Sequence, residues 1–502
     1  MSDRGTTHGP TLLHTAFPPD SSPNGWRIRE NPSSITRFCM PIDLTEALAS
    51  LRLGRHSARA LLTDNLAHAD SAACEHVFLR RFDEEARRAA EASDAAARRG
   101  EPRPPLGGLA VSVKDLFDVA GHPTTAASAA MADARPAGRD APAVARLRAA
   151  GAALIGHTNL SEFAFSGVGI NPHHGTPRNP ATRAIDGQDR IPGGSTSGGA
   201  VSVATGAAWA ALGSDTGGSL RIPAALQGLV GCKGTARRVP LEGCVPLAPS
   251  LDTAGAITRS VRDAALLHAV LSGDAVDLDE RPLSAWRFAI TPTFMQDELE
   301  PAVASAFERA LATLRAAGAR IEARALPALP RVAELQTQGG LTAAEAWAWH
   351  HARLAERGDR YDPRVALRIR RGEAILPATY QALRDARHRW IHDMTAEMSD
   401  IDAFLSPTVP LQAPEIAPLL TSDDLFFATN ARLLRNTAVV NLLDGCAISI
   451  PCEHPGELPV GLMLWAPAGR DRAVLGAASR VEATLKADVK ADFKAALAAG
   501  TR

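Results

Sequence analysis

Residues 192–221 read "PGGSTSGGAVSVATGAAWAALGSDTGGSLR", with two glycine-flanked serine clusters on either side of a short apolar segment. Glycine loses more conformational entropy on ordering than any other residue, so this density needs a structural or chemical reason. The apolar middle is typical of a helix that leads into a strand. Strand and helix patterns keep alternating to about residue 272, which predicts an α/β fold.

The sequence before this stretch predicts a helical region and then a buried strand. Residues 43–46, "DLTE", resemble a capping box that opens a helix, and helix-forming residues dominate to residue 99. The run "LGGLAVSVKDLFDVAG" at 106–121 is apolar with Gly at both ends, as expected of a strand in a covered sheet. Residues 140–156 predict a helix followed by a strand.

The remaining sequence predicts a mostly helical region and then a return to strands. Ala, Arg and Glu dominate about residues 285–400, where we expect mostly helices. Short apolar strands with Pro breaks follow, and an Ala-rich helix begins at Asp471. We therefore divide the chain into an arm, one large domain and a tail, at residues 1–42, 43–490 and 491–502. Within the domain we expect a core of alternating strands and helices at about 105–272. A helical part follows at about 285–400, and C-terminal strands with a helix at about 401–490.

Composition limits the partners and the compartment. The formal net charge of the 502 residues is −1, so no overall field favours nucleic acid or a membrane surface. We find no signal-peptide pattern at the N-terminus and no run of about 20 apolar residues. The six cysteines lack CxxC spacing, and His and Cys do not cluster as metal ligands. We expect reduced thiols, a cytoplasmic protein and no metal.

Two kinds of chemistry that use Gly and Ser fit this sequence poorly. A P-loop needs GxxxxGK[ST] and a dinucleotide-binding turn needs GxGxxG, and neither pattern is present. A Ser-His-Asp hydrolase with a nucleophile elbow needs GxSxG, and neither Ser195 nor Ser219 has Gly at both positions. His173 and His174 are the best histidine candidates, although a His pair in a Pro/Gly loop is more often structural.

A serine activated by lysine is the third kind of chemistry. Ser219 follows "DTGG", where glycine permits the positive φ that lets successive N–H groups converge on an oxyanion. An ordinary strand-to-helix turn accounts for "SDTGGS" equally well.

Lys114 is the candidate base because it ends the apolar strand "LAVSVK". Its reference pKa is about 10.4, so a base at pH 7 needs a shift of roughly 3.4 units, about 4.6 kcal/mol, which burial can supply. Asp115 would oppose that shift, but adjacent strand residues face opposite sides. A solvated strand end is the ordinary alternative for Lys114.

Four regions of the chain resemble the amidase signature family. They read "GGLAVSVKDLFDVAG", "PGGSTSGGAVSVATG", "ALGSDTGGSLRIPAALQGLVGCKGT", and "DAFLSPTVP" with "NLLDGCAISIPCEHPGELPVGLMLW". The resemblance covers about residues 43–485. It implies a single large α/β domain with a central mixed β-sheet covered by helices on both faces. It also implies hydrolysis of a small or medium carboxamide, with no metal or organic cofactor and no nucleic-acid or membrane partner; we leave a homodimer open.

The resemblance also implies a Ser–cis-Ser–Lys triad. By position, Ser219 is the nucleophile, Ser195 the bridging serine and Lys114 the base. The peptide bond between Gly194 and Ser195 is expected to be cis. The implied oxyanion donors are the backbone N–H groups of Thr216, Gly217, Gly218 and Ser219.

Substrate contacts are less defined by the sequence. Thr196 replaces a serine of the family pattern, and Arg221 is either a structural ion-pair partner or a contact for an acidic substrate. The loop at 181–192 is long and could border the pocket. Aromatic residues of the helical part are candidates for the acyl pocket, with a core role as the alternative: Trp347, Trp349, Tyr361 and Tyr380.

Two other functions remain open. The A subunit of a tRNA-dependent amidotransferase shares the fold and triad, but glutamine-using members carry an acid shortly before the C-terminal "N-L" segment. Residues 431–440, "ARLLRNTAVV", have none. A non-catalytic binding protein on the same scaffold is the other alternative, against which the intact Ser–Ser–Lys set argues.

Overall fold

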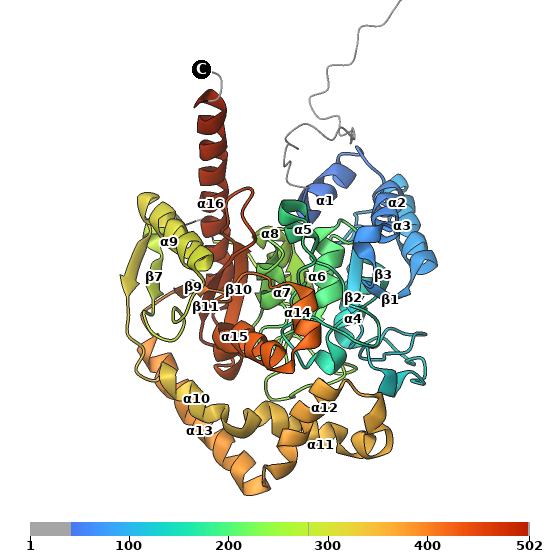
Figure 1. The fold of residues 1–502 in the computed structure, drawn as a ribbon. Helices are drawn as coiled ribbons and strands as arrows, with labels where there is room; N and C mark the ends of the chain where they lie inside the picture. Colours follow the sequence, from blue (N-terminus) through green and yellow to red (C-terminus); the bar gives the residue numbers. More distant parts are fainter. Residues whose placement is uncertain (1–41, 280, 500–502) are drawn as a thin grey trace, which may run out of the picture. The chain divides into compact units, whose positions relative to one another are not determined.

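The computed structural model describes residues 42–279 and 281–499, which contain a mixed sheet of 11 strands (Figure 1). In chain order the strands are β1 (Phe78–Arg81), β2 (Ala110–Lys114), β3 (Ala153–Thr158), β4 (Ala210–Ser214), β5 (Val230–Lys233), β6 (Ala254–Thr258), β7 (Arg287–Ile290), β8 (Arg320–Ala323), β9 (Ala403–Pro407), β10 (Cys446–Pro451) and β11 (Gly461–Ala466). Their order in the sheet is β1-β3-β2-β4-β6-β5-β10-β11-β9-β7-β8. Strand β2 is parallel to β3 and β4, whereas β4, β6, β5, β10, β11 and β9 pair antiparallel in succession.

Helices lie on both faces of this sheet, as expected. They are α1 (Leu44–Arg52), α2 (Ala58–Ala69), α3 (Asp83–Arg98), α4 (Pro142–Ala149), α5 (Pro180–Asp186), α6 (Ser197–Ala204), α7 (Arg221–Ala225), α8 (Val261–Ser272), α9 (Pro301–Ala316), α10 (Val332–Leu335), α11 (Gly340–Arg357), α12 (Pro363–Arg370), α13 (Pro377–Glu397), α14 (Ile416–Thr421), α15 (Asp423–Leu442) and α16 (Asp471–Ala499). One core cluster joins α8, α9 and α16 to one face, and another joins α6 and α7 to the opposite face.

The Gly/Ser stretch forms α6, β4 and the start of α7, so it supplies both the centre of the sheet and its cover. Strand alternation sends the Ser112 hydroxyl of β2 to the Ser202 hydroxyl of α6, 2.9 Å away. Val111 and Val113 point the other way, into a core cluster with Leu267 of α8. Lys114 therefore shares the face of β2 that lies against the Gly/Ser helix.

The expectation of helices over 285–400 is right for α9 to α13 but misses β7 and β8. Each of these strands has only four residues, too few for a clear alternating pattern. Strand β7 is fixed by pairing with β9, more than 100 residues later in the sequence. Pairing with a distant strand therefore determines the conformation of β7, whose local sequence pattern is ambiguous.

Helices lie near both ends of the described chain. Asp43 caps α1, because its side chain accepts from the Glu46 N–H at 2.9 Å. Residues 1–41 of the predicted arm at 1–42 lie outside the described residues, and the backbone of α16 continues as a helix past residue 490, where we expected a tail.

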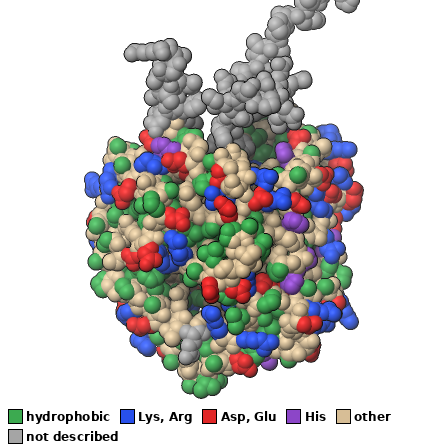
Figure 2. All heavy atoms as spheres, in the orientation of Figure 1, with side chains coloured by type: hydrophobic (Ala, Val, Ile, Leu, Met, Phe, Trp, Pro, Cys, Tyr) green, Lys and Arg blue, Asp and Glu red, His purple; other side chains and the backbone are tan. Residues whose placement is uncertain are grey.

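Surface charge is mixed on the face drawn in Figure 2, where acidic and basic side chains alternate. This agrees with the formal net charge of −1. None of the helices described is both long and apolar enough to cross a bilayer.

Candidate active site

Lys114 is fully buried at the end of β2 and contacts two serine hydroxyls. Its Nζ lies 2.7 Å from Ser195 Oγ and 2.9 Å from Ser214 Oγ. Burial lowers the pKa of Lys114 to about 7, although the charge of Asp215 acts in the opposite direction. A lysine with this pKa is neutral in about half of the molecules at pH 7, compared with about one in three thousand at a pKa of 10.5.

Asp115 faces away from Lys114, as strand alternation predicted. Its carboxylate accepts from the Thr125 and Ala127 N–H groups and lies 3.2 Å from His157 Nδ1. Burial raises the pKa of Asp115 to about 6. The two adjacent charged residues thus occupy different environments.

The first serine cluster forms a turn between residue 192 and α6. The Gly194–Ser195 peptide bond is cis, which confirms the prediction. The Gly194 N–H donates to the Gly167 carbonyl at 2.8 Å, and the Ser161 N–H donates to the Ser195 carbonyl at 3.2 Å. A Cβ on Gly194 would lie 2.7 Å from both Gly169 N and Ser161 Oγ, so only glycine fits there.

The second cluster turns between β4 and α7 and carries Ser219. The Thr196 N–H donates to the Ser219 carbonyl at 3.3 Å, which joins the two serine clusters directly. Both Ser195 and Ser219 are buried. The structure therefore brings Lys114, Ser195 and the Ser219 turn into one buried region, as the sequence predicted.

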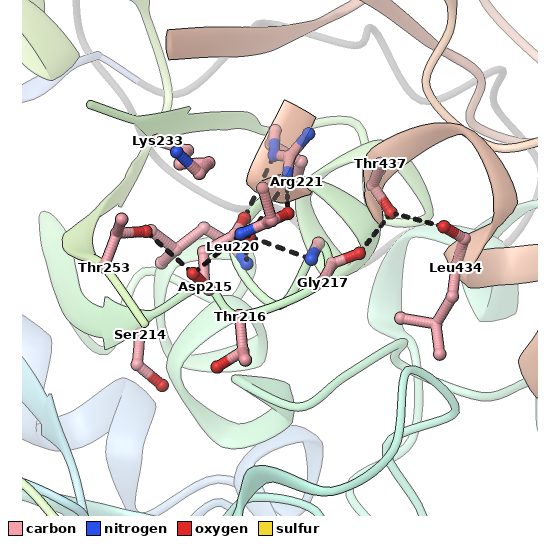
Figure 3. Close-up of polar contacts among 12 residues, drawn as sticks. Ser214, Asp215, Thr216, Gly217, Leu220, Arg221, Lys233, Thr253, Leu434 and Thr437 are labelled. Atoms are coloured by element: carbon pink, nitrogen blue, oxygen red, sulfur yellow. Dashed lines mark hydrogen bonds and ion pairs between the residues drawn. The ribbon is translucent and has the colours of Figure 1, made fainter. Parts of the chain in front are cut away.

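Asp215 holds the Ser219 turn in place (Figure 3). Its carboxylate accepts from the N–H groups of Gly218 at 2.8 Å and Leu220 at 3.2 Å, and from Arg221 Nε at 3.0 Å and Nη2 at 2.9 Å. Burial alone would raise the pKa of Asp215, but the Arg221 guanidinium and the Asn441 amide lower it to about 2. The carboxylate is thus a permanent anion that fixes the turn.

These bonds reduce the predicted set of oxyanion donors. The Gly218 N–H is donated to Asp215, so it is already occupied. The N–H groups of Thr216, Gly217 and Ser219 donate to no acceptor within the described chain. Three of the four N–H groups therefore remain able to bind an oxyanion.

Two predicted substrate contacts instead support the turn. Arg221 is fully buried, and its guanidinium is engaged by Asp215 and by Asn441 Oδ1 at 2.6 Å, so the structural alternative holds. Thr196 is also fully buried, and its hydroxyl donates to the Ser214 carbonyl at 3.4 Å. Both side chains are thus engaged with the segments that surround the turn.

Two of the aromatic pocket candidates, Tyr361 and Trp349, pack around Phe163. Tyr361 is 3% exposed, bonds to His350 Nδ1 at 2.9 Å and stacks on Phe163 at 5.1 Å, so it belongs to the core. Trp349 is half-buried and meets the Phe163 ring edge-on at 6.0 Å. It backs the 161–167 loop, which contacts the Ser195 turn.

The other two aromatic candidates lie among the helices of the 340–397 region. Trp347 is half-buried against the core, and the Tyr380 hydroxyl donates to Glu345 Oε1 at 3.0 Å. Within residues 42–279 and 281–499, neither side chain hydrogen-bonds to Lys114, Ser195 or Ser219.

The histidine alternative gains no geometric support. His173 Nε2 lies 3.0 Å from the buried carboxylate of Glu162, which raises the pKa of His173. Within the described ranges, no histidine hydrogen-bonds to Ser195 or Ser219. The predicted loop at 181–192 is helical as far as Asp186, in α5, and its remaining residues reach the 413–416 segment, where Arg190 forms a β-bridge with Glu415.

Helix α15 contributes residues that the sequence analysis missed. The Thr437 hydroxyl donates to the Gly217 carbonyl at 2.6 Å (Figure 3). The Asn441 amide donates to the Asp215 carboxylate at 2.9 Å and to its backbone carbonyl at 3.0 Å. Both residues lie more than 200 positions after the turn that they hold, so no local signal could have indicated them.

Arg368 of α12 is a second residue that was missed. Its guanidinium lies 4.3 Å from the centre of the Phe165 ring and donates to the Phe165 carbonyl. No carboxylate of the described chain pairs with it, and burial lowers the pKa of Arg368 to about 10. Phe165 lies two residues before Gly167, whose carbonyl holds the Ser195 turn, so an unpaired cation lies close to the site.

Comparison with known proteins agrees with this geometry. The Amidase family model matches residues 60–475. The chain is 37% identical over 405 residues to the 2-amino-5-chloromuconic acid deaminase of Comamonas testosteroni, a match that spans 80% of this chain and 86% of the relative. It is 32% identical over 486 residues to the A subunit of the glutamyl-tRNA(Gln) amidotransferase of Thermobifida fusca, spanning 88% and 95%. A crystal structure of an amidase superposes with a TM-score of 0.79 and 35% identity over 88% of this chain and 99% of that one.

Proposed function

The chain belongs to the amidase family and is an amidohydrolase, and from this premise we propose that Ser219 forms an acyl-enzyme while Ser195 and Lys114 move the proton. The observation that carries the proposal is the 2.7 Å contact between Lys114 Nζ and Ser195 Oγ, together with the depressed pKa of Lys114. A serine nucleophile needs such a base because its hydroxyl is a weak nucleophile at neutral pH.

The first half of the reaction transfers the acyl group. Neutral Lys114 takes a proton from the Ser195 hydroxyl, which takes one from Ser219 as its Oγ attacks the amide carbonyl. The tetrahedral oxyanion is stabilised by the free N–H groups of Thr216, Gly217 and Ser219. Ser195 then protonates the departing amine and regains a proton from Lys114, and the C–N bond breaks.

The second half regenerates the enzyme. A water molecule loses a proton to the same relay and attacks the acyl carbonyl. Ser219 leaves as the alkoxide and is reprotonated through Ser195. The products are a carboxylate and ammonia or an amine, and every proton is carried by groups of this chain.

We further propose that the substrate carries a carboxylate near the scissile amide. The Arg368 guanidinium is partly buried and has no counter-ion among the described residues, which favours an anionic ligand group. The relative of 37% identity is named for an acid substrate, which supports the same class.

The five described cysteines are free, which is typical of a reducing compartment such as the cytoplasm.

Two experiments test these roles. Ser219→Ala and Lys114→Ala are expected to lower kcat/KM by about three orders of magnitude or more, while Ser197→Ala, whose hydroxyl bonds to the Asn159 carbonyl, is the matched control. Mass spectrometry of a trapped adduct on Ser219 would report the acyl half. Full activity of correctly folded Ser219→Ala would refute the mechanism.

The substrate class is tested on a pair of amides that differ only in a carboxylate. Arg368→Gln is expected to raise KM for the acid amide about tenfold or more, since a charge-assisted bond is worth roughly 1.5–3 kcal/mol. The neutral amide should be little affected, and Arg370→Gln on the exposed side of the same helix is the control. Equal effects on both amides would count against the carboxylate.

The A subunit of an amidotransferase is the second candidate, favoured by relatives of 32% identity over most of their length. The segment 431–440 lies in α15 beside the Ser219 turn and has no acidic residue. Glutaminase activity, or copurification with a tRNA-binding partner, would reverse the order of these two candidates.

A further inference from the structure

One cavity has three arginines in its lining and includes none of Lys114, Ser195 and Ser219. It lies between α13, the 237–250 loop and the turn that follows α15. Its lining residues are Arg237, Ser250, Arg384, Arg387, His388 and Asp444. Three guanidinium groups and one carboxylate therefore lie at the cavity wall.

Arg387 and Asp444 form the fixed base of this cavity. Arg387 is 5% exposed and donates to the carbonyls of Leu442 at 2.8 Å and Asn441 at 3.2 Å, as well as to Asp444. These carbonyls belong to the last turn of α15, which would otherwise present unsatisfied acceptors. Arg387 thus covers the negative C-terminal end of α15, and the helix in turn fixes the position of Arg387.

Arg237, Arg384 and Ser250 keep N–H or O–H donors that no acceptor of the described chain occupies. Arg237 uses one guanidinium nitrogen to bond Asp444 Oδ2 at 3.1 Å and leaves the others free. Arg384 makes no hydrogen bond or ion pair in the described part of the chain; its guanidinium lies 5.9 Å from the Tyr380 ring centre. The Ser250 hydroxyl is buried without a partner, which a buried polar group normally avoids.

One further carboxylate lies behind this wall and is already engaged. Glu345 accepts from the Ser250 N–H at 2.9 Å and from the Tyr380 hydroxyl at 3.0 Å. Counting Glu345 and Asp444 against the three arginines still leaves one positive charge and an excess of N–H donors. A ligand that complements this cavity must bring oxygen acceptors and negative charge.

We propose that this cavity binds a small oxyanion, the phosphate or carboxylate group of a metabolite. Guanidinium groups match the geometry of both oxyanions and bind them through paired N–H donors. Arg384 and Arg237 would close over the ligand from the exposed side, Arg387 would supply the buried charge, and Ser250 would donate its free hydroxyl. The site lies behind α15 and does not use the triad.

Titration calorimetry with inorganic phosphate and, separately, with acetate tests this proposal on the full chain at low ionic strength. Saturable binding is expected for at least one of the two ions, and which one identifies the group recognised. Arg384→Gln should weaken it about tenfold, and Ser250→Ala should also weaken it. Arg389→Gln, an exposed arginine of the same helix outside the lining, is the matched control and should bind like the parent.

Two more variants separate this site from the proposed catalytic site. Ser219→Ala and Arg368→Gln should retain the oxyanion affinity, whatever they do to hydrolysis. Absence of saturable binding of both ions would overturn the proposal. So would equal affinities of Arg384→Gln and Arg389→Gln, provided that thermal melts show both variants folded.

Discussion

The charge state of Lys114 makes a prediction that links stability to catalysis. Burial lowers the pKa of Lys114 to about 7 in the folded protein, whereas the ordinary value in an unfolded chain is 10.5. Between these two values the unfolded chain binds more protons at this site than the native state. The contribution of Lys114 to the free energy of unfolding therefore rises as the pH increases from about 7 to about 10.5.

The size of this effect follows from the two pKa values. At pH 6 burial of the charged lysine costs about 5 kcal/mol, and at pH 9 the residual cost is about 2 kcal/mol. Lys114→Met removes the charge and keeps a side chain of similar length. The stability advantage of Lys114→Met over the parent should thus shrink by about 3 kcal/mol from pH 6 to pH 9.

Urea denaturation of both proteins at several pH values measures this difference. Other titrating groups affect both proteins alike, so only the change in their difference matters. The parent should also gain kcat/KM through an apparent pKa near 7, because only neutral Lys114 can take a proton from Ser195. Parallel stability profiles for the two proteins, or an acid limb of activity above pH 9, would refute the argument.

Two other substitutions test the geometry around Ser219. Gly218→Ala would place a Cβ 2.2 Å from Thr437 Oγ1 at a φ of +136°. We therefore expect the free energy of unfolding to fall by about 2–4 kcal/mol and most of the activity to be lost. Gly138→Ala, whose Cβ would meet open space, is the control, and equal melting temperatures of the two variants would contradict the close approach. Ser214→Ala removes a hydroxyl that accepts a hydrogen bond from Lys114 and so stabilises its protonated form. The pKa of Lys114 should fall, and the acid limb of the kcat/KM profile should move to lower pH. A shift to higher pH would contradict this role of the bond.

The parts of the site that local sequence predicts are the parts built from short motifs. Ser195 and Ser219 lie in Gly-rich turns whose composition is itself the signal, and Lys114 ends a strand whose apolar run predicts burial. Strand alternation then predicts that Lys114 and Asp115 separate, and the structure agrees. In each case the cause lies within a few residues of the feature.

The missed parts depend on contacts between distant segments. Asn441 and Arg368 occur in ordinary helical sequence, and only the packing of α15 and α12 beside the turns gives them a role. The sequence leaves two alternatives for Arg221 because its partner, Asp215, becomes inaccessible only after the sheet and α15 enclose it. The short strand β7 escapes prediction for the same reason, since its pairing partner is remote.

A second buried lysine shows why the identity of the base cannot be derived from burial alone. Lys233 is as buried as Lys114, and burial lowers its pKa to about 8. Its Nζ, however, donates to the carbonyls of Gly234 at 3.0 Å and Gly445 at 2.6 Å. A carbonyl oxygen has no proton to give, so these contacts favour Lys233 as a donor. Lys114 contacts hydroxyls, which can both accept and donate, and this difference in partner chemistry is what allows Lys114 to take a proton from Ser195.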